Sequence, residues 1–466
     1  MAELRPGDSV EAVIERVVPG GEGLARIGGV VTLVSGALPG DRVRVRVTES
    51  SPRLIRAVLE EVVAAGEARR PDGELCPRAR DASCGGCDWP AVRLEAHRAL
   101  KTALVLDALR RIAGIRPEEL PEPGWRGSPR NYRLRNRLHF DREGRLGFFA
   151  PRSRVVANLE VCEIVSRTLL ARLPAIREHL SGLGSAEGEL RTLEDREGKT
   201  LLGELRLDEG QDLKISSKGE EKQRAGRGPF DGFRVVAADG RVLFSDGPDS
   251  LPIAAGGASF DVGVSCFFQG NLFLLDEFLE EIRTALRAGR EDFLRKEEGS
   301  QLPLRAVDLY AGVGFMTRPL LEFAAEVRSA AGCAVEVTAV EIDKTSSHSL
   351  SKNLQAWHEE GLPLARAVRA SAESFLSSLS SQKSPLPLSL LLADPPRAGL
   401  SPEVRKGILR LAPRRLLMVS CDPPTLARDL AALKSRYAVE RLTLLDLFPQ
   451  THHVETIALL ARRKVG

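Results

Sequence analysis

The carboxyl-terminal half of the chain alternates apolar runs with stretches of helical periodicity, and this alternation limits the possible folds more than any other feature. It extends from about residue 256 to the end of the 466-residue chain. Such a pattern is typical of a parallel sheet with helices on both faces. Open sheets of this class bind ligands at the carboxyl ends of their strands, so the residues that follow each apolar run are candidate site residues.

The pattern changes twice along the chain, and we predict three domains, covering residues 1–62, 63–255 and 256–466. The first is rich in strands, with apolar stretches at 10–18 and 30–34 on either side of a glycine-rich turn. It ends in the alternation Arg42–Val47, which would bury valines on one side and expose arginines on the other. Several short strands with glycine turns in about 60 residues predict a small β-barrel.

The middle region begins with cysteines and an amphipathic helix. Apolar residues at helical spacing run from Leu94 to Ile112, and Gly114 is a typical helix stop. Residues 125–255 are rich in arginine and favour strands. The polar stretch 216–222 is expected to be a surface loop.

A net charge of +3 does not by itself argue for a nucleic-acid partner, but the charge is unevenly distributed. Between Arg126 and Arg154 nine arginines face only two acidic residues. Three of them, Arg133, Arg135 and Arg137, alternate along a strand, which would place three guanidiniums on one face. That face suits a phosphate backbone. A charged, solvated edge strand explains the pattern equally well.

Composition indicates a cytoplasmic globular protein. The chain is 43% hydrophobic and 28% charged, its first residues lack the apolar core of a signal peptide, and no run approaches the roughly 18 apolar residues of a membrane helix. We therefore expect no membrane contact, and we expect a monomer. Because the cytoplasm is reducing, seven cysteines indicate metal binding or catalysis rather than disulfides.

Three strand ends predict a site for a nucleoside cofactor. The run 305–310 leads into a glycine turn containing Gly312 and Gly314, where backbone amides can approach a ligand. The run 335–340 ends in Glu341, which is placed to hold ribose hydroxyls. This pattern fits a dinucleotide or S-adenosylmethionine.

Two observations favour S-adenosylmethionine. The third glycine of the dinucleotide fingerprint is missing, because position 317 is threonine. The run 390–393 ends in Asp394-Pro395-Pro396, a methyltransferase signature. The next residue is Arg397 rather than the aromatic residue of amino-group methyltransferases, so the methylated atom is not expected to be an exocyclic amine.

Cys421 ends the apolar run 415–421 and precedes Asp422-Pro423-Pro424, through which we expect neither a helix nor a strand to continue. A thiol at the carboxyl end of a strand can be a nucleophile. A free cysteine is more often a small core residue, and Cys421 alone favours that interpretation.

Five motifs together give the chain a resemblance to a known family. In chain order they are Phe267 to Asn271, Asp308 to Gly314, Asp394 to Arg397, Ser420 to Pro423 and His453 to Thr456. With these motifs the chain resembles the RNA uracil-5 methyltransferases, and its amino-terminal barrel resembles the OB-like TRAM domain of the 23S ribosomal RNA type. The resemblance implies an α/β Rossmann-like class I methyltransferase domain, preceded by the barrel and by a mixed, β-rich central RNA-binding domain.

The resemblance also implies a covalent mechanism. Uracil C5 is a poor nucleophile until a thiolate adds to C6, and Cys421 is the expected thiolate. Glu455 is the expected base that removes the C5 proton. Contacts to the cofactor are expected from Gln269, Tyr310, Gly312, Glu341 and Asp394. Ser371 stands where relatives carry Asp or Asn, which puts an adenine contact there in doubt.

Four other cysteines, Cys76, Cys84, Cys87 and Cys162, supply the number of thiolates that a 4Fe-4S cluster or a structural zinc ion needs. Their spacing leaves both groups open, and the resemblance favours the cluster. Cys76 stands farther from Cys84 than is usual in the family. The Cys-x3-Cys-x2-Cys run of radical enzymes is absent, and Cys266 and Cys333 are expected in the core.

The sequence leaves the RNA open. The target base must be single-stranded or flipped out of a helix. Ribosomal RNA is the expected substrate, and the T-loop uridine of transfer RNA is the alternative. Two other classes remain: an RNA cytosine-5 methyltransferase, which typically carries a second active-site cysteine, and a non-catalytic iron–sulfur RNA-binding protein.

Overall fold

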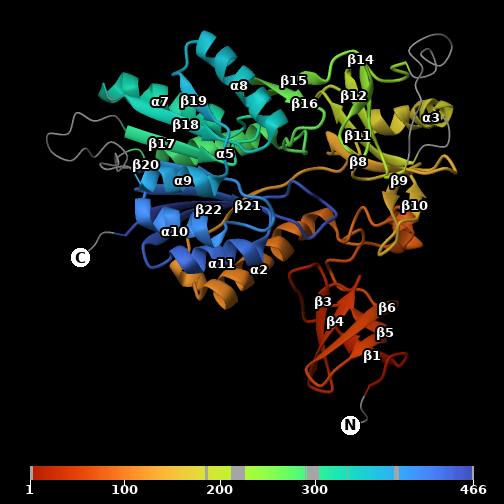
Figure 1. Ribbon diagram of the computed structural model, residues 1–466. Helices are drawn as coiled ribbons and strands as arrows, with labels where there is room; N and C mark the ends of the chain where they lie inside the picture. Colours follow the sequence, from red (N-terminus) through yellow and green to blue (C-terminus); the bar gives the residue numbers. More distant parts are fainter. Residues whose placement is uncertain are drawn as a thin grey trace.

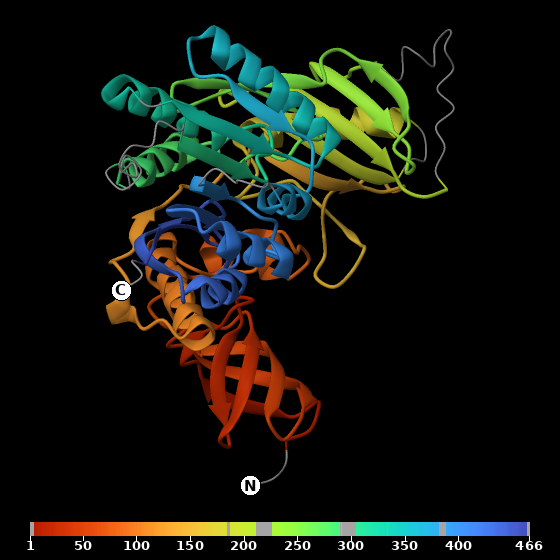
Figure 2. The ribbon, with the colours of Figure 1, turned by 60° about the vertical axis from the view of Figure 1, so that its left-hand side comes forward.

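The chain forms a small amino-terminal barrel, a central sheet and a large mixed sheet with helices on both faces (Figure 1). The computed structural model describes residues 4–183, 187–210, 226–288, 290, 304–332, 334–381 and 388–463. The polar stretch 216–222 and Cys333 lie outside these residues. Both views show the barrel projecting from one end of the molecule (Figures 1 and 2).

The barrel consists of six strands in the order β1-β5-β6-β4-β3-β2. Val43, Val45 and Val47 are buried while the arginines between them are exposed, which confirms the predicted alternation. The predicted run 10–18 is two strands rather than one, interrupted where the backbone of Ile14 bonds to Asp41. The strands are β1 (Ser9–Val13), β2 (Arg16–Val17), β3 (Gly23–Ile27), β4 (Val30–Ser35), β5 (Arg42–Ser50) and β6 (Leu54–Ala64).

The central sheet has seven strands in the order β10-β9-β8-β11-β12-β13-β14. Helix α3 (Arg167–Gly182) buries Leu169, Leu173 and Ile176 in a core shared with this sheet. Only β12 and β13 pair in parallel. The strands are β8 (Arg135–Phe140), β9 (Leu146–Phe149), β10 (Val156–Asn158), β11 (Gly188–Glu194), β12 (Leu201–Leu207), β13 (Gly232–Val236) and β14 (Val242–Asp246).

The arginine strand lies inside this sheet, between β9 and β11, so the edge-strand interpretation is wrong. Arg135 and Arg137 lie on the side opposite the buried Asn136 and Leu138, as the alternation predicts, but the three guanidiniums are not equally accessible to solvent. Arg133 packs over the ring of Phe148 at 5.5 Å, and burial lowers the pKa of Arg135 to about 10. Only Arg137 is exposed, and its Nε is 3.2 Å from a carboxylate oxygen of Glu189.

The large sheet has the strand order β19-β18-β17-β20-β21-β23-β22-β7. All neighbouring strands pair in parallel except β23, which is antiparallel to both of its neighbours. The reason is that the connection 446–454 contains no helix, and a parallel return needs a long crossover. The strands are β7 (Gly124–Arg126), β17 (Leu304–Leu309), β18 (Val335–Val340), β19 (Ala365–Val368), β20 (Leu388–Ala393), β21 (Arg415–Ser420), β22 (Tyr437–Leu445) and β23 (Glu455–Arg462).

Helices cover both faces of the large sheet, as the alternating pattern predicts (Figure 1). One face is covered by α5 (Leu275–Ala288), α7 (Thr317–Ala331) and α8 (Lys344–Glu359). The other is covered by α9 (Ala372–Ser380), α10 (Pro402–Leu411) and α11 (Pro423–Leu433). The hairpin β15 (Ser250–Ala255) and β16 (Ala258–Gly263) leads into α5. No described helix is both long and apolar enough to cross a bilayer.

Two elements from the middle of the chain pack with the large sheet and its helices. Helix α2 (His97–Ala108) packs with α11, and β7 adds a parallel strand beside β22. The helix continues as a π-turn to Gly114, where φ is +62°, so its predicted end is confirmed. Leu104 and Ala108 of the predicted apolar face are buried, whereas Ile112 is exposed and Lys101 is fully buried against Asp446. The boundaries of the three domains remain a prediction.

Candidate active site

Four of the predicted site residues meet at one edge of the large sheet. Tyr310, Glu341, Asp394 and Cys421 each follow a strand, namely β17, β18, β20 and β21. Because these strands are parallel neighbours, their carboxyl ends share one edge. Gln269 reaches the same edge from the connection between β16 and α5, and its Nε2 is 3.5 Å from Oδ2 of Asp394.

The glycine turn after β17 wraps around a small pocket. Gly312 adopts φ +57°, and its N–H donates to Oε2 of Glu341 at 2.8 Å, while the N–H of Asp343 donates to Oε1 of the same carboxylate at 2.7 Å. Tyr310 holds φ +60°, which is uncommon for a residue with a side chain and often marks a functional constraint. The pocket is lined by Phe267, Phe268, Gln269, Tyr310, Ala311, Gly312, Val313, Phe315, Met316 and Asp394.

Carboxyl groups dominate the charge around this pocket. Asp308 is fully buried and accepts from Thr317 Oγ1 at 2.6 Å through one oxygen, while its Oδ1 has no hydrogen-bond partner. Burial, with smaller contributions from Asp394 and Glu341, raises the pKa of Asp308 to about 7. Burial also raises the pKa of Asp394 to about 7. A cationic ligand fits this setting, because a positive charge would stabilise the ionised carboxylates.

Cys421 and Glu455 come together across two antiparallel strands. Ser420 pairs with Thr456 at the end of the β21–β23 ladder, so the next residues on each strand are Cys421 and Glu455. Burial, and then the charge of Glu455, raises the pKa of the Cys421 thiol to about 12. Burial and Asp394 raise the pKa of Glu455 well above its ordinary value, and Arg397 opposes both shifts.

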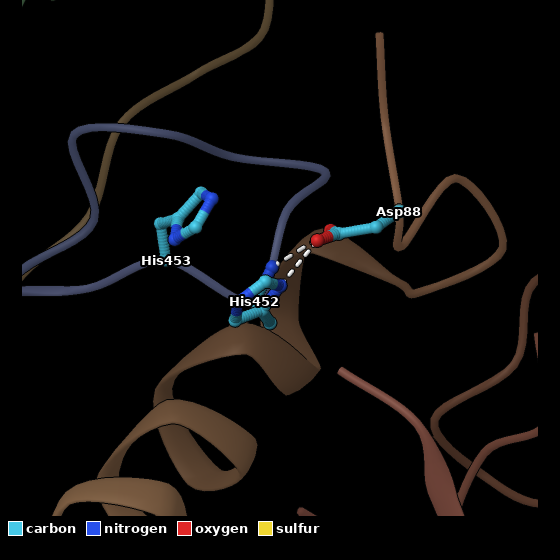
Figure 3. A group of neighbouring side chains, drawn as sticks. All are labelled: Asp88, His452 and His453. Carbon is cyan, nitrogen blue, oxygen red and sulfur yellow. Dashed lines mark hydrogen bonds and ion pairs between the residues drawn. The ribbon is translucent and has the colours of Figure 1, made fainter. Parts of the chain in front are cut away.

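Arg397 is the cation that opposes both shifts, and it contacts His453, which Figure 3 shows together with His452 and Asp88. Its Nη2 donates to Nε2 of His453 at 2.8 Å. Burial, together with His452 and Arg397, lowers the pKa of His453 to about 3, so this ring is neutral and accepts the bond. The neighbouring His452 contacts Asp88, its backbone N–H donating to Oδ1 at 2.9 Å and its Nδ1 lying against Oδ2.

The four predicted metal cysteines also lie in one neighbourhood. Cys76 caps the short helix α1 (Pro77–Arg80), and Cys84 accepts from the N–H of Gly86 at 3.4 Å. Burial raises the pKa of Cys84, Cys87 and Cys162. Electrostatic repulsion from other cysteines of the four raises each of these pKa values further. None of the four forms a disulfide.

Two glycines let the cysteine stretch approach the central sheet. The N–H of Gly85 donates to the carbonyl of Phe149 at 2.8 Å, and a Cβ on Gly85 would lie 2.9 Å from that oxygen. A Cβ on Gly86 would meet the ring of Phe148 at 2.7 Å. Side chains at these positions would push the thiols away from β9.

Among the described residues, one group of side chains has its possible metal-ligating atoms within 4.8 Å of one another. This group consists of Asp88, His452 and His453, and it does not include the cysteines. A tetrahedral zinc ion with bonds of about 2.3 Å would draw its sulfurs to roughly 3.8 Å. The position of the four thiols leaves both zinc and an iron–sulfur cluster open.

The structure adds to the account of two sequence features. Strand β21 ends at Ser420, before Asp422, as expected, but Pro423 and Pro424 also begin α11, which Asp422 caps by accepting from the N–H of Thr425 at 2.9 Å. Ser371 caps α9 in the same way. Cys266 is fully buried, as expected.

Sequence reasoning gave no role to four residues near the site. Phe267 is 63% exposed although it lines the pocket, and its place in a quoted motif is the signal that could have singled it out. Asp88, His452 and His453 had no such signal as a group, because the contact joins residues 364 positions apart.

Comparison with known proteins agrees with this geometry. Residues 305–463 match the family model described as tRNA (uracil-5-)-methyltransferase, and residues 3–59 match that of the TRAM domain. An uncharacterised RNA methyltransferase of Thermosynechococcus vestitus is 30% identical over 99% of each chain. The chain belongs to the RNA uracil-5 methyltransferase family.

The other similarities extend over most of the chain. The 23S rRNA (uracil(1939)-C(5))-methyltransferase RlmD of Shewanella sp. (strain MR-7) is 28% identical, covering 95% of this chain and 94% of its own. The crystal structure of the Pyrococcus abyssi tRNA (uracil-54, C5)-methyltransferase with S-adenosyl-L-homocysteine has the same fold, with a TM-score of 0.68, 19% identity, and coverage of 97% of this chain and 100% of that one. The predicted family, fold class and TRAM domain are confirmed, and the protein is an S-adenosylmethionine-dependent RNA uracil-5 methyltransferase.

Proposed function

We propose that this enzyme methylates C5 of a specific uridine in 23S ribosomal RNA through a covalent bond between Cys421 and C6 of the base. The observation that carries the mechanism is the convergence of Cys421, Glu455 and Arg397 at the edge of the sheet that also carries the cofactor pocket. Cys421 is the only described cysteine at this edge.

The reaction proceeds in three steps. The thiolate of Cys421 adds to C6, and the electron pair of the C5–C6 double bond moves toward O4. The electron pair then returns from O4, C5 attacks the methyl carbon of S-adenosylmethionine, and the bond between that carbon and the sulfonium sulfur breaks, so that S-adenosylhomocysteine leaves. Finally a base removes the C5 proton, and the electrons of that C–H bond restore the C5–C6 double bond as the thiolate leaves.

The neutral thiol of the free enzyme must lose its proton before the first step. Arg397 favours the thiolate, whereas burial and three carboxyl groups, those of Glu455, Asp394 and Asp422, oppose it. A bound cation near Asp394 would shift this balance toward the thiolate. The nucleophile is therefore protected until the cofactor arrives.

Glu455 is the base in this proposal. Its carboxyl group is 5% exposed and sits beside Asp394, so a proton is held tightly in the free enzyme. The same environment makes the ionised group a strong base. Because Glu455 begins β23, its position is fixed by strand pairing to Leu445 on one side and by the β21 ladder on the other.

For the cofactor, we propose that Gln269, Tyr310, Gly312, Glu341 and Asp394 form the contacts. Glu341 would hold the ribose hydroxyls, and the buried acidic groups would favour the positive sulfonium and amino groups. The unpartnered Oδ1 of Asp308 supports this assignment, because a buried acceptor without a donor is costly.

For the other cysteines, we propose a 4Fe-4S cluster held by Cys76, Cys84, Cys87 and Cys162. The number of thiolates, the family resemblance, and the N–H groups of Gly86, Ile164 and Val165 beside the sulfurs support a cluster over zinc. Metal analysis of anaerobically purified protein tests it: about four irons and four sulfides per chain are expected, whereas one zinc would contradict the proposal.

The RNA target is tested by incubating the enzyme with unmodified 23S ribosomal RNA and with transfer RNA, followed by mass spectrometry of the nucleosides. We expect 5-methyluridine at one position of the ribosomal RNA, because the relative named for that substrate matches almost the whole chain. Methylation of transfer RNA alone would favour the alternative substrate, and 5-methylcytidine would contradict the choice of base.

A further inference from the structure

The stretch before Glu455 is fastened to residues that neighbour the metal cysteines. We name residues 446–454 the Glu455 loop and residues 76–89 the cysteine segment. Asp88 directly follows Cys87, and it accepts from the backbone N–H of His452 at 2.9 Å and contacts the His452 ring. Figure 3 shows Asp88 and His452 on two separate segments of the chain, with the Asp88 carboxylate facing His452.

The next residue of the cysteine segment adds a second attachment. The backbone N–H of Trp89 donates to the carbonyl of Gln450 at 3.0 Å. Gln450 adopts φ +67°, a left-handed conformation that costs roughly 1 kcal/mol or more and persists only where neighbours hold it. The Trp89 ring is 2% exposed, and its Nε1 donates to Gly21 of the barrel at 2.9 Å.

Other contacts hold the remainder of the Glu455 loop. Lys101 Nζ donates to the carbonyls of His453 at 2.6 Å and Phe448 at 3.2 Å, and Tyr132 Oη donates to Pro449 at 3.1 Å. The barrel contacts the same place, since a Cβ on Gly21 would lie 3.1 Å from Nδ1 of His452. The contact of Asp88 with His452 is therefore the point where three regions of the chain meet.

At its other end the Glu455 loop reaches the proposed active site. His453 contacts the guanidinium of Arg397, and Glu455 follows two residues later. A displacement of His452 would move both His453 and the start of β23. Small displacements at a catalytic site are costly, since a shift of about 1 Å can reduce a rate 100-fold.

We infer that Asp88 and His452 are positioning residues, through which the cysteine segment and the metal group bound to it fix Arg397 and Glu455 for catalysis. This inference rests on the proposed function of the site and adds a role for the cysteine-bound group: it orders the Glu455 loop. The group then acts through the shape of the loop, with no electron transfer.

The test compares Asp88→Asn, His452→Ala and His452→Asn in the full chain with its metal group retained. The asparagine at 452 keeps an N–H donor at the place of Nδ1, whereas alanine removes it. Asp81→Asn is the matched control, because Asp81 lies in the cysteine segment and bonds only locally to Ser83. Iron and sulfide content of each variant is measured first, so that loss of the metal group is recognised.

Hydrogen exchange read by mass spectrometry over residues 446–455 is the primary measurement. We expect about tenfold faster exchange there in Asp88→Asn and His452→Ala, and wild-type exchange in His452→Asn and Asp81→Asn. Removing the metal group from the wild type with a chelator is expected to speed exchange in the same peptide. The same removal in His452→Ala is expected to add less there than in the wild type, because the side-chain contact with Asp88 is already lost.

Steady-state kinetics give the second measurement. Asp88→Asn and His452→Ala are expected to lower kcat about 10- to 100-fold, the range usual for residues that orient catalytic groups, with the KM values for RNA and cofactor nearly unchanged. Unchanged exchange over 446–455 in both variants with full metal content would overturn the inference. If the wild type shows no methyl transfer at all, the proposed function fails instead, and the exchange data still decide whether the two segments are coupled.

Discussion

Cys421 and Glu455 occupy adjacent ends of two antiparallel strands, one residue beyond the paired Ser420 and Thr456. The two residues that the proposed mechanism uses are thus held beside each other by the backbone hydrogen bonds of the ladder. The arrangement predicts that the addition and the proton-removal steps can be separated by mutation.

Glu455→Gln should trap the covalent intermediate. Burial and Asp394 raise the pKa of this carboxyl group, which favours its neutral form, and glutamine is neutral and of nearly the same shape, so folding should be preserved. We expect an RNA–protein adduct that survives denaturing electrophoresis, and a product yield reduced at least about 100-fold, the lower end of the range for loss of a general base. Cys421→Ala should form no adduct, even with RNA containing 5-fluorouridine. An adduct in Cys421→Ala would refute the assigned nucleophile.

Alkylation of Cys421 by iodoacetamide should be slow at neutral pH in the free enzyme. Because the pKa of this thiol is raised to about 12, its thiolate fraction should grow about tenfold per pH unit from pH 7 to 10, without a plateau. Peptide mass spectrometry follows this cysteine separately from the others. A plateau near pH 9, the value for an ordinary thiol, would contradict the prediction.

Glu341→Ala should weaken cofactor binding. The variant loses a carboxylate that organises the N–H groups of Gly312 and Asp343, and hydrogen bonds to charged groups contribute about 1.5 to 3 kcal/mol, or roughly 10- to 100-fold in affinity. Calorimetric titration with S-adenosylhomocysteine measures it. Glu336→Ala, on the exposed side of the same strand, is the control and should bind normally.

Phe267→Ala should impair RNA binding but not cofactor binding. An aromatic ring that is 63% exposed at the mouth of the pocket can stack on a base, and such stacking contributes about 1 to 3 kcal/mol. We expect a 5- to 150-fold rise, in rough terms, in the KM for RNA. Phe267→Trp should retain binding, because it keeps a stacking surface. Equal losses in both variants would argue against stacking.

Asp308→Asn should change how stability depends on pH. The folded pKa of Asp308 is raised to about 7 from an ordinary value of 3.8, so its protonated form is favoured in the native state. The wild type should therefore be as stable as the variant below pH 4 and lose stability relative to it as pH rises to about 7. Since one pKa unit corresponds to about 1.4 kcal/mol, the difference is at most roughly 4 kcal/mol. Urea unfolding at pH 4, 6 and 8 measures it, and parallel stability curves would contradict the prediction.

Much of the fold and site could be predicted because local patterns encode them. Strand ends such as Glu341 and Asp394 are visible as the last residues of apolar runs, and the sheet then brings them together without further information. Arg135 could not be placed correctly, because alternation shows which side of a strand a residue occupies but not what covers that side. The contact of Asp88 with His452 joins residues far apart in the chain, and no local pattern reports it.

The pairing of β7 with β22 has a consequence for how this protein is made. Residues 97–126 leave the ribosome long before Tyr437–Leu445 are synthesised. The apolar surfaces of α2 and β7 therefore stay exposed until the end of translation. A fragment that starts near residue 256 would lack this cover and present a bare strand edge, which promotes aggregation. Any minimal catalytic fragment of this enzyme therefore has to carry that earlier stretch with it.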